Sequence, residues 1–394
     1  MRERFIFLLF LGIDVSVLLL ESSGISISYR EAKTLYESYS LLHYIINASL
    51  SFFGQNDFAL RLPMIAIHIA SVLLFYALST RYLQRSSDRL WLAAIFMLLP
   101  GVNSSALLVD NSALVILGLL AYVYTKDTSP RIAMAVLFFG LFIDVSFAML
   151  YLGLFFFAVN RRDRGVMITA LLLFGASMYL HGFDTHGSPK GHFLDVLGLY
   201  AAIFSPIVFI YMVYILFRRF VVREHDLLWY LSVTPLVLSL LLSFRQELEI
   251  QMFAPYLLLS MPLAAQAFFH SYRVRLKRYR KKYRVLFAIS FALLLIHALA
   301  VLFNKELYRF MEPGQKHFAN KQHIAKELAE ALKGQGIACV NSEDYKMQLR
   351  LQFYGIGECE AYRMGHTPVP GANNVTISYM NLPVYPAYVT KVNK

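Results

Sequence analysis

The 394-residue sequence is poor in cysteine, tryptophan and charge. It has two cysteines and two tryptophans, and only 16% of its residues are Asp, Glu, Lys or Arg. Two cysteines exclude a disulfide-rich scaffold and a cysteine-based metal cluster. The low charge, beside 58% hydrophobic residues and a mean hydropathy of +0.52, excludes a soluble protein, whose surface must be covered by polar groups. The sequence therefore predicts a polytopic α-helical membrane protein.

Three kinds of sequence pattern are also missing. There is no glycine-rich phosphate loop and no cysteine/histidine spacing typical of zinc sites. There is also no internal repeat of the kind that forms the inverted halves of many transporters. Function must therefore be read from polar residues in the loops.

Long apolar runs fill the first three quarters of the chain. A membrane span needs about 20 apolar residues, and fewer where helices are buried among others. Residues 132–159 form one apolar run broken only at Asp144, which we divide into two spans. No small-residue cleavage site follows Leu20, so the first run is expected to remain as a span. We predict eleven spans, at 5–20, 62–80, 90–106, 108–125, 131–143, 145–159, 166–180, 194–217, 227–243, 251–269 and 285–303.

The net charge of +12 is placed on one side of these spans. With the N-terminus inside, the inner segments hold 21 Lys and Arg residues and the outer segments before the tail hold five. This bias is typical of cytoplasmic loops, so it excludes nucleic acid as a partner and places the first loop and the tail outside. The basic run 271–284 is expected to contact anionic membrane lipids.

From Asn304 the composition becomes that of a small soluble α/β domain. Ile324, Leu328 and Leu332 lie at a spacing of four before Gly334, which predicts a helix. Residues 343–353 predict a second helix, and 337–341, 358–362 and 374–380 predict strands. Cys339 and Cys359 lie in the first two strands, where they could form a disulfide or remain two buried thiols.

The stretch Ser28–Pro63 is the first long polar segment, and it carries charges next to apolar runs. One interpretation is an outer catalytic loop in which Glu31 acts as a general base or binds a cation. The alternative is a solvated connector with an amphipathic helix on the membrane surface. Both readings are consistent with the spacing.

Other acids could supply a second carboxylate. Asp110 and Asp144 lie at the outer ends of predicted spans, where the alternative role is to cap a helix. Asp14 lies within the first span, where an acid is costly and must be functional or paired. Residues 181–195 collect three histidines, two aspartates and Lys190, which could bind a metal or phosphate or simply be solvated; His192 is favoured.

Outer cations are few. Arg61, Arg245 and Lys190 could hold the charge of a lipid phosphate, and the alternative is ordinary snorkelling at the interface.

The residues Arg30-Glu31-Ala32 followed by FGQNDFALRLP at 53–63 resemble the first outer loop of C-type (GT-C) membrane glycosyltransferases. The likeness is to the bacterial branch that includes protein O-mannosyltransferases and lipid A aminoarabinose transferases. Family members typically carry an Asp-Glu pair, then an aromatic-Gly-acid segment leading into Arg-Leu-Pro. Arg30 stands where Asp is usual, so Glu31 would carry the role of the acid alone.

This resemblance implies a GT-C-like fold of about eleven spans (1–303) with an outer catalytic loop (21–61) and a periplasmic α/β domain (304–394). It implies glycosyl transfer, hexosyl or pentosyl, from a polyprenyl-phosphate donor to lipid A, protein or glycan outside a bacterial inner membrane, with inversion. A divalent metal stays an open alternative. The implied roles are catalysis by Glu31 and Asp110, donor-phosphate binding by Arg61, Arg245, Lys190 and His192, and acceptor binding or support by Tyr29, Arg30 and Glu247.

Three other functions compete with this one. A flippase of lipid-linked sugars could use the same outer cations. A polysaccharide ligase or polymerase would also use polyprenyl donors, but it would need a larger late outer loop than 244–251. Arg30 in place of Asp also leaves open a binding or scaffolding homologue without activity.

Overall fold

A computed structural model describes residues 2–182, 191–310, 318–379 and 382–392, and the chain divides into two compact units. The helical unit comprises Met1–Val15, Ala66–Ala106 and Asn111–Ala298. The mixed unit, which contains the strands, comprises Ser16–Ile65, Leu107–Asp110 and Leu299–Lys394. The mixed unit thus gathers the first predicted outer loop, a short segment after residue 106 and the tail.

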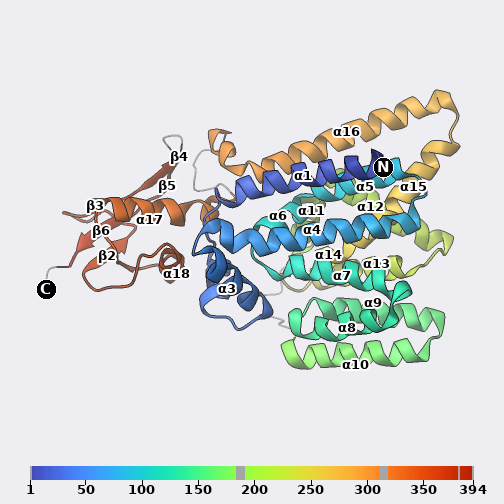
Figure 1. The fold of residues 1–394 in the computed structure, drawn as a ribbon, viewed down its shortest axis with the longest axis horizontal. Coiled ribbons are helices and arrows are strands. Elements are labelled where there is room, and N and C mark those ends of the chain that lie inside the picture. Colours follow the sequence, from blue (N-terminus) through green and yellow to red (C-terminus); the bar gives the residue numbers. More distant parts are fainter. Residues whose placement is uncertain (1, 183–190, 311–317, 380–381, 393–394) are drawn as a thin grey trace. The chain divides into compact units, whose positions relative to one another are not determined.

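Every stretch predicted as a span is helical. Five helices are long and apolar enough to cross a membrane, or seven if each bent pair counts as one span, within the described residues. The helices are α1 (Arg2–Ser22), α4 (Asp57–Tyr82), α5 (Ser86–Leu98), α6 (Pro100–Leu107), α7 (Asn111–Thr128), α8 (Pro130–Ile143), α9 (Phe147–Arg161), α10 (Arg164–His181), α11 (Phe193–Phe204), α12 (Pro206–Val222), α13 (Leu227–Leu242), α14 (Ala254–Leu257), α15 (Met261–Val274) and α16 (Lys277–Leu302), with 3-10 turns η1 (Ile250–Met252) and η2 (Leu258–Ser260) (Figure 1).

The two bent pairs break next to prolines. The axes of α5 and α6 differ by 59° at Leu99, and those of α11 and α12 by 107° at Ser205. A residue before proline is pushed out of the helical region by the proline ring. Leu99 accordingly has the extended values φ −64° and ψ 127°. Ser205 has φ +64° and ψ 135°, which ends α11 and turns the chain before Pro206 begins α12.

The long apolar run 132–159 breaks at Asp144, as predicted. Asp144 Oδ1 accepts a hydrogen bond from the Ser146 backbone N–H at 2.8 Å, and Oδ2 accepts one from the Asn111 amide at 2.7 Å. Close packing fixes α7, α8 and α9, because a Cβ added to Gly118 or Gly140 would lie 2.6 or 2.4 Å from the buried Phe147 ring. Small residues at such contacts allow helices to approach closely.

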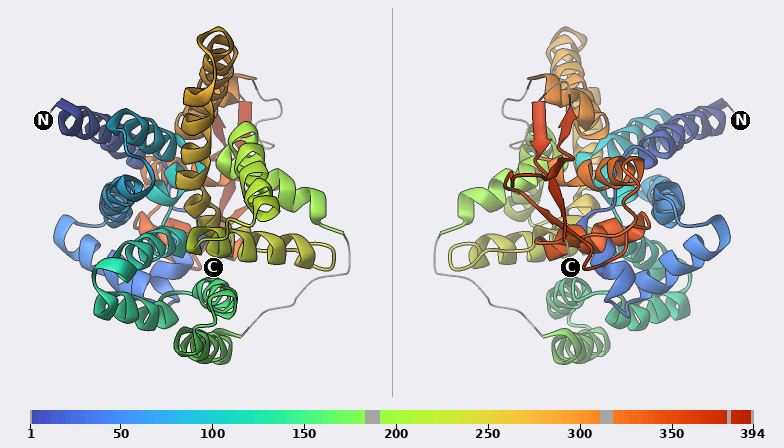
Figure 2. Two further views of the ribbon diagram at one scale, coloured as in Figure 1. Left: turned by 90° about the vertical axis from the view of Figure 1, so that its right-hand side faces the viewer. Right: turned by 90° about the vertical axis from the view of Figure 1, so that its left-hand side faces the viewer.

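The mixed unit combines the predicted loop with the tail. Its helices are α2 (Tyr29–Tyr36), α3 (Leu41–Phe53), η3 (Asn304–Phe310), η5 (Asn320–Gln322), α17 (Ile324–Gly334) and α18 (Tyr345–Phe353). Its strands are β1 (Asn341–Ser342), β2 (Tyr362–Gly365), β3 (Asn373–Asn374), β4 (Ile377–Tyr379), β5 (Leu382–Tyr385) and β6 (Tyr388–Lys391) (Figure 1). Figure 2 shows this C-terminal part of the chain in orange and red from two sides. One sheet has the order β1-β2-β6-β3, with β1 and β2 parallel, and β4 pairs with β5.

The predicted helices of the tail are confirmed and its predicted strands are only partly right. The strand expected at 337–341 is reduced to β1 and a single bridge between Cys339 and Gly357, and the strand expected at 358–362 begins only at Tyr362. The disulfide Cys339–Cys359 joins the two segments just before the strands pair. Of the two alternatives left open by the sequence, the structure has the disulfide.

Candidate functional site

Glu31 is fixed at the start of α2 by a capping box. Its Oε2 accepts a hydrogen bond from the Ser28 backbone N–H at 2.7 Å, while Ser28 Oγ accepts one from the Glu31 N–H at 3.3 Å. The sequence S-x-x-E at the end of an extended segment produces this reciprocal pair, which satisfies two backbone donors at the helix N-terminus. The carboxylate is therefore held in one orientation by its own helix.

Two further groups contact the Glu31 carboxylate. Oε1 accepts a buried hydrogen bond from the Val109 backbone N–H at 2.9 Å, and Oε2 lies 3.6 Å from a terminal nitrogen of Arg61. Glu31 is only 1% exposed. Both oxygens are thus engaged, and one of them holds the backbone of the residue immediately before Asp110.

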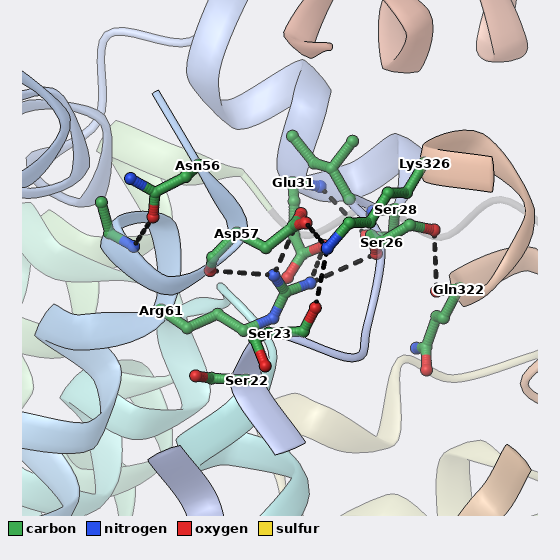
Figure 3. Close-up of polar contacts among 12 residues, drawn as sticks. Ser22, Ser23, Ser26, Ser28, Glu31, Asn56, Asp57, Arg61, Gln322 and Lys326 are labelled. Atoms are coloured by element: carbon green, nitrogen blue, oxygen red, sulfur yellow. Dashed lines mark hydrogen bonds and ion pairs between the residues drawn. The ribbon is translucent and has the colours of Figure 1, made fainter. Parts of the chain in front are cut away.

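Arg61, in the second turn of α4, is fully buried beside two carboxylates. It donates to the carbonyl oxygens of Asp57 and Ser26, each at 3.2 Å, and lies 3.7 Å from Asp57 Oδ1. A buried guanidinium is tolerated only where carboxylates and hydrogen bonds replace water. The Arg61 charge is balanced in this way (Figure 3).

Asp57 links Arg61 to the tail. Tyr354 donates its hydroxyl to Asp57 Oδ1 at 2.6 Å, and Lys326 Nζ lies 3.2 Å from Oδ2. Burial, together with the Asp57 charge, raises the pKa of Tyr354 well above its usual range, so its hydroxyl keeps the proton that it donates. Glu31, Asp57, Arg61, Lys326 and Tyr354 form one assembly, the Arg61 cluster.

A second buried arginine, Arg350, supports the segment before α2. Its Nε donates to the Ile27 carbonyl at 2.8 Å, and it also donates to the Lys321 carbonyl. Burial lowers the pKa of Arg350. Sequence reasoning missed Asp57, Lys326, Tyr354 and Arg350. The i,i+4 spacing of Asp57 and Arg61 was a usable signal, whereas nothing in the tail sequence indicated its three residues.

The other predicted site residues fall in both units. In the mixed unit, Tyr29 lies under the Lys346 ammonium group, Arg30 is exposed and Asp110 is half-buried. In the helical unit, Arg245 and Glu247 are exposed, and His192 Nδ1 lies 3.2 Å from Asp195 Oδ2. Lys190 lies outside the described residues. The structure therefore brings Glu31, Arg61 and the Asp110 segment together within one unit.

Two questions raised by the sequence concern metal ligands and Asp14. Across residues 2–182, 191–310, 318–379 and 382–392, no three His, Cys, Asp or Glu side chains are grouped to hold a metal ion. Asp14 is paired with His68 of α4, whose Nε2 lies 2.7 Å from its Oδ2. The costly acid in the first span thus has a partner that the sequence did not reveal.

We compared the sequence and the fold with those of known proteins. No protein-family model matches the sequence, and no curated protein does either. Among solved structures, ArnT from Cupriavidus metallidurans in the apo state matches 97% of each chain, with a TM-score of 0.55 and 9% identity.

The chain has the fold of ArnT. The structure of ArnT bound to undecaprenyl phosphate matches over the same share of both chains, with a TM-score of 0.52 and 11% identity. The resemblance to the GT-C glycosyltransferases drawn from the first loop is thus confirmed as a resemblance of fold over nearly the whole chain. It covers the tail as well as the helices.

Proposed function

We propose that this protein transfers a glycosyl group from a polyprenyl-phosphate carrier to an acceptor on the outer side of a bacterial inner membrane, with inversion at the anomeric carbon. The observation that carries the proposal is the likeness of fold to ArnT, which covers 97% of both chains. The ArnT structure compared is the one bound to undecaprenyl phosphate. Lipid A, a protein or a glycan would serve as acceptor.

The charge pattern supports an orientation for this reaction. In our proposal the eleven helical stretches span the membrane, the N-terminus is cytoplasmic and the tail is periplasmic, because 21 basic residues lie in the inner segments against five in the outer ones. The mixed unit, with the Arg61 cluster and Asp110, would then face the periplasm.

The geometry favours different tasks for the two candidate carboxylates. A general base must lie within hydrogen-bond reach of the proton that it removes. Glu31 is buried, and its oxygens are engaged by Ser28, Val109 and Arg61, whereas Asp110 is half-buried. We therefore assign the proton transfer to Asp110, and we assign to Glu31 the task of positioning the Val109–Asp110 backbone.

The same argument distinguishes the cations. Arg61 is paired with the carboxylates of Glu31 and Asp57, so we assign it a positioning role. The exposed Arg245, with His192 and Lys190, is better suited to hold the departing lipid phosphate, because a guanidinium binds phosphate through paired hydrogen bonds. Tyr29, Arg30 and Glu247 would contact or support the acceptor.

The test is sugar transfer by the purified protein in lipid nanodiscs, given labelled polyprenyl-phosphate donors and candidate acceptors. Asp110→Asn should lower kcat by on the order of 100-fold or more and remove the acidic limb of the pH–rate profile. Glu358→Gln, a change at an exposed acid of the mixed unit, is the matched control and should leave turnover unchanged.

Two results would contradict the proposal. If Asp110→Asn keeps most turnover while Glu31→Gln abolishes it, the two carboxylates have the opposite roles. If the protein moves donor lipid across the bilayer but never forms a glycosylated product, it is a flippase.

A further inference from the structure

Two adjoining cavities open in the helical unit, and none of the proposed catalytic or donor-binding residues lines them. The larger, of about 600 Å³, lies between α5, α12, α15 and α16 and has mainly apolar walls. The smaller, of about 340 Å³, has a polar lining that includes Gln266 and His270. Arg218 and Ile215 line both. An apolar chamber that meets a polar one at an arginine suits an amphiphilic ligand with an anionic centre.

The charges around the two cavities are unbalanced. Among the described lining residues of the larger cavity there are two arginines, Arg218 and Arg275, and no carboxylate. The smaller adds Arg219 and Glu224, and Arg219 is already occupied by Asp226 at 3.5 Å and Gln266 at 3.0 Å. The described lining of the larger cavity therefore holds two arginines and no carboxylate, and a phosphate bound there would balance their charge.

The length of the larger cavity suggests which lipid it takes. Its lining runs along α12 from Ile207 to Arg218, and the eleven helical steps between these two residues span roughly 16 Å at about 1.5 Å per residue. That is about half of the roughly 30 Å hydrocarbon core. The cavity thus matches an acyl chain of one leaflet, with the arginines at the end where headgroups lie.

The lining of the smaller cavity indicates which kind of lipid headgroup it can bind. Hydroxyl groups can bond to Gln266 and His270. The charged lining residues of the two cavities are Arg218, Arg219, Arg275 and Glu224, a net positive set that favours a headgroup of net negative charge over a zwitterionic one. We propose that these two cavities bind one anionic glycerophospholipid of the phosphatidylglycerol type, with its phosphate on Arg218 and Arg275 and an acyl chain between α12 and α16. This site is separate from the proposed glycosyl transfer.

The proposal assigns a specific task to one residue of the basic run 271–284. Arg275 stands between α15 and α16, with its guanidinium 4.2 Å from the Tyr283 ring centroid, and it lines the cavity. Arg278 and Arg284 belong to the same run and do not line it. They provide a control that removes the same charge from the same surface.

The experiment is native mass spectrometry of the delipidated full-length protein, titrated separately with phosphatidylglycerol, phosphatidylethanolamine and undecaprenyl phosphate. Wild type should bind a first phosphatidylglycerol at least about tenfold more tightly than phosphatidylethanolamine, because the first lipid has a net negative charge and the second has none; tenfold corresponds to about 1.4 kcal/mol. Arg218→Gln with Arg275→Gln should lose this preference, and Arg278→Gln with Arg284→Gln should keep it. Ser290→Phe, which fills the chamber, should weaken binding without removing charge.

Three results would overturn the proposal. These are equal binding of both phospholipids by wild type, equal losses in the test and control pairs, and displacement of phosphatidylglycerol by undecaprenyl phosphate at equal concentration. Thermal unfolding of each lipid-free variant shows whether the variant is folded. If a variant does not fold, the preference of the wild-type protein for phosphatidylglycerol over phosphatidylethanolamine still tests the proposal. Sugar transfer by the Arg218→Gln, Arg275→Gln protein should be retained, so failure here is distinct from failure of the proposed function.

Discussion

Two sets of arginines in this molecule have opposite surroundings. Arg61 in the mixed unit is fully buried, and the carboxylates of Glu31 and Asp57 lie within 3.7 Å of it. Arg218 and Arg275 in the helical unit are exposed and border a cavity with no carboxylate among its described lining residues. The charge of Arg61 is balanced inside the protein, whereas Arg218 and Arg275 remain accessible to a bound anion.

This difference separates structural from ligand-binding cations. Burying a charge without a partner is strongly unfavourable, so a fully buried arginine indicates an internal ion pair on which folding depends. An exposed arginine beside an apolar cavity has no such dependence. Removing the two kinds of charge should therefore change different quantities, stability in one case and lipid affinity in the other.

The largest effect is expected for Arg61→Met. The change leaves Glu31 and Asp57 buried without their shared cation, so we expect a loss of about 3–5 kcal/mol in the free energy of unfolding. Thermal unfolding in detergent, followed by circular dichroism, measures it. Lys33→Gln, at an exposed position of α2, is the control and should unfold like wild type.

Adding Glu31→Gln to Arg61→Met should recover part of the loss, because one of the stranded charges is then neutral. A stable Arg61→Met protein would show that Lys326 alone balances both carboxylates. The comparison between the two arginine sets would then fail.

The disulfide gives a reference for the size of the Arg61 effect within the same unit. Cys339 and Cys359 are 20 residues apart, and closing a loop of that length stabilises by about 3 kcal/mol in the chain-entropy model. Replacing both cysteines by Ala should lower the unfolding temperature of the mixed unit. Limited proteolysis of the tail at increasing temperature measures this change. Reductant should destabilise wild type equally and leave the double variant unaffected; a response of the variant to reductant would count against this account.

Tyr354→Phe tests the edge of the Arg61 cluster. The hydroxyl donates to Asp57 and accepts from the Ile27 N–H at 2.9 Å, so the variant loses two hydrogen bonds, worth about 1–3 kcal/mol together. Lys326 still faces Asp57, which keeps the effect below that of Arg61→Met. The same unfolding assay applies, with Tyr388→Phe as the control. Equal stability of the two variants would remove Tyr354 from the cluster.

The sequence predicted the local parts of this fold well. The eleven apolar stretches are helical, the chain breaks at Asp144, and α17 and α18 lie close to where the 3.6-residue spacing indicated. These features depend on residues near one another in the chain. The strands β5 and β6 were missed because each is only four residues long and carries a weak alternating pattern.

The site was less predictable because it is assembled from distant segments. Glu31 and Arg61 were recognisable from the first loop, but Lys326 and Tyr354 come from a tail about 300 residues further along. Their contacts depend on tertiary packing, which leaves no periodic signal in a single sequence. The pairing of Asp14 with His68 was hidden for the same reason.

The smallest effect on stability, and the sharpest test of the comparison, is expected for Arg218→Gln combined with Arg275→Gln. The two substitutions leave no buried carboxylate without its cation. The free energy of unfolding of the lipid-free variant should therefore lie within about 0.5 kcal/mol of the wild-type value. Adding phosphatidylglycerol at 100 times its dissociation constant should stabilise wild type by about 2.7 kcal/mol, because only the folded protein binds it. The variant should gain much less. A large loss without lipid would mean that these arginines hold the helices together, as Arg61 holds the mixed unit.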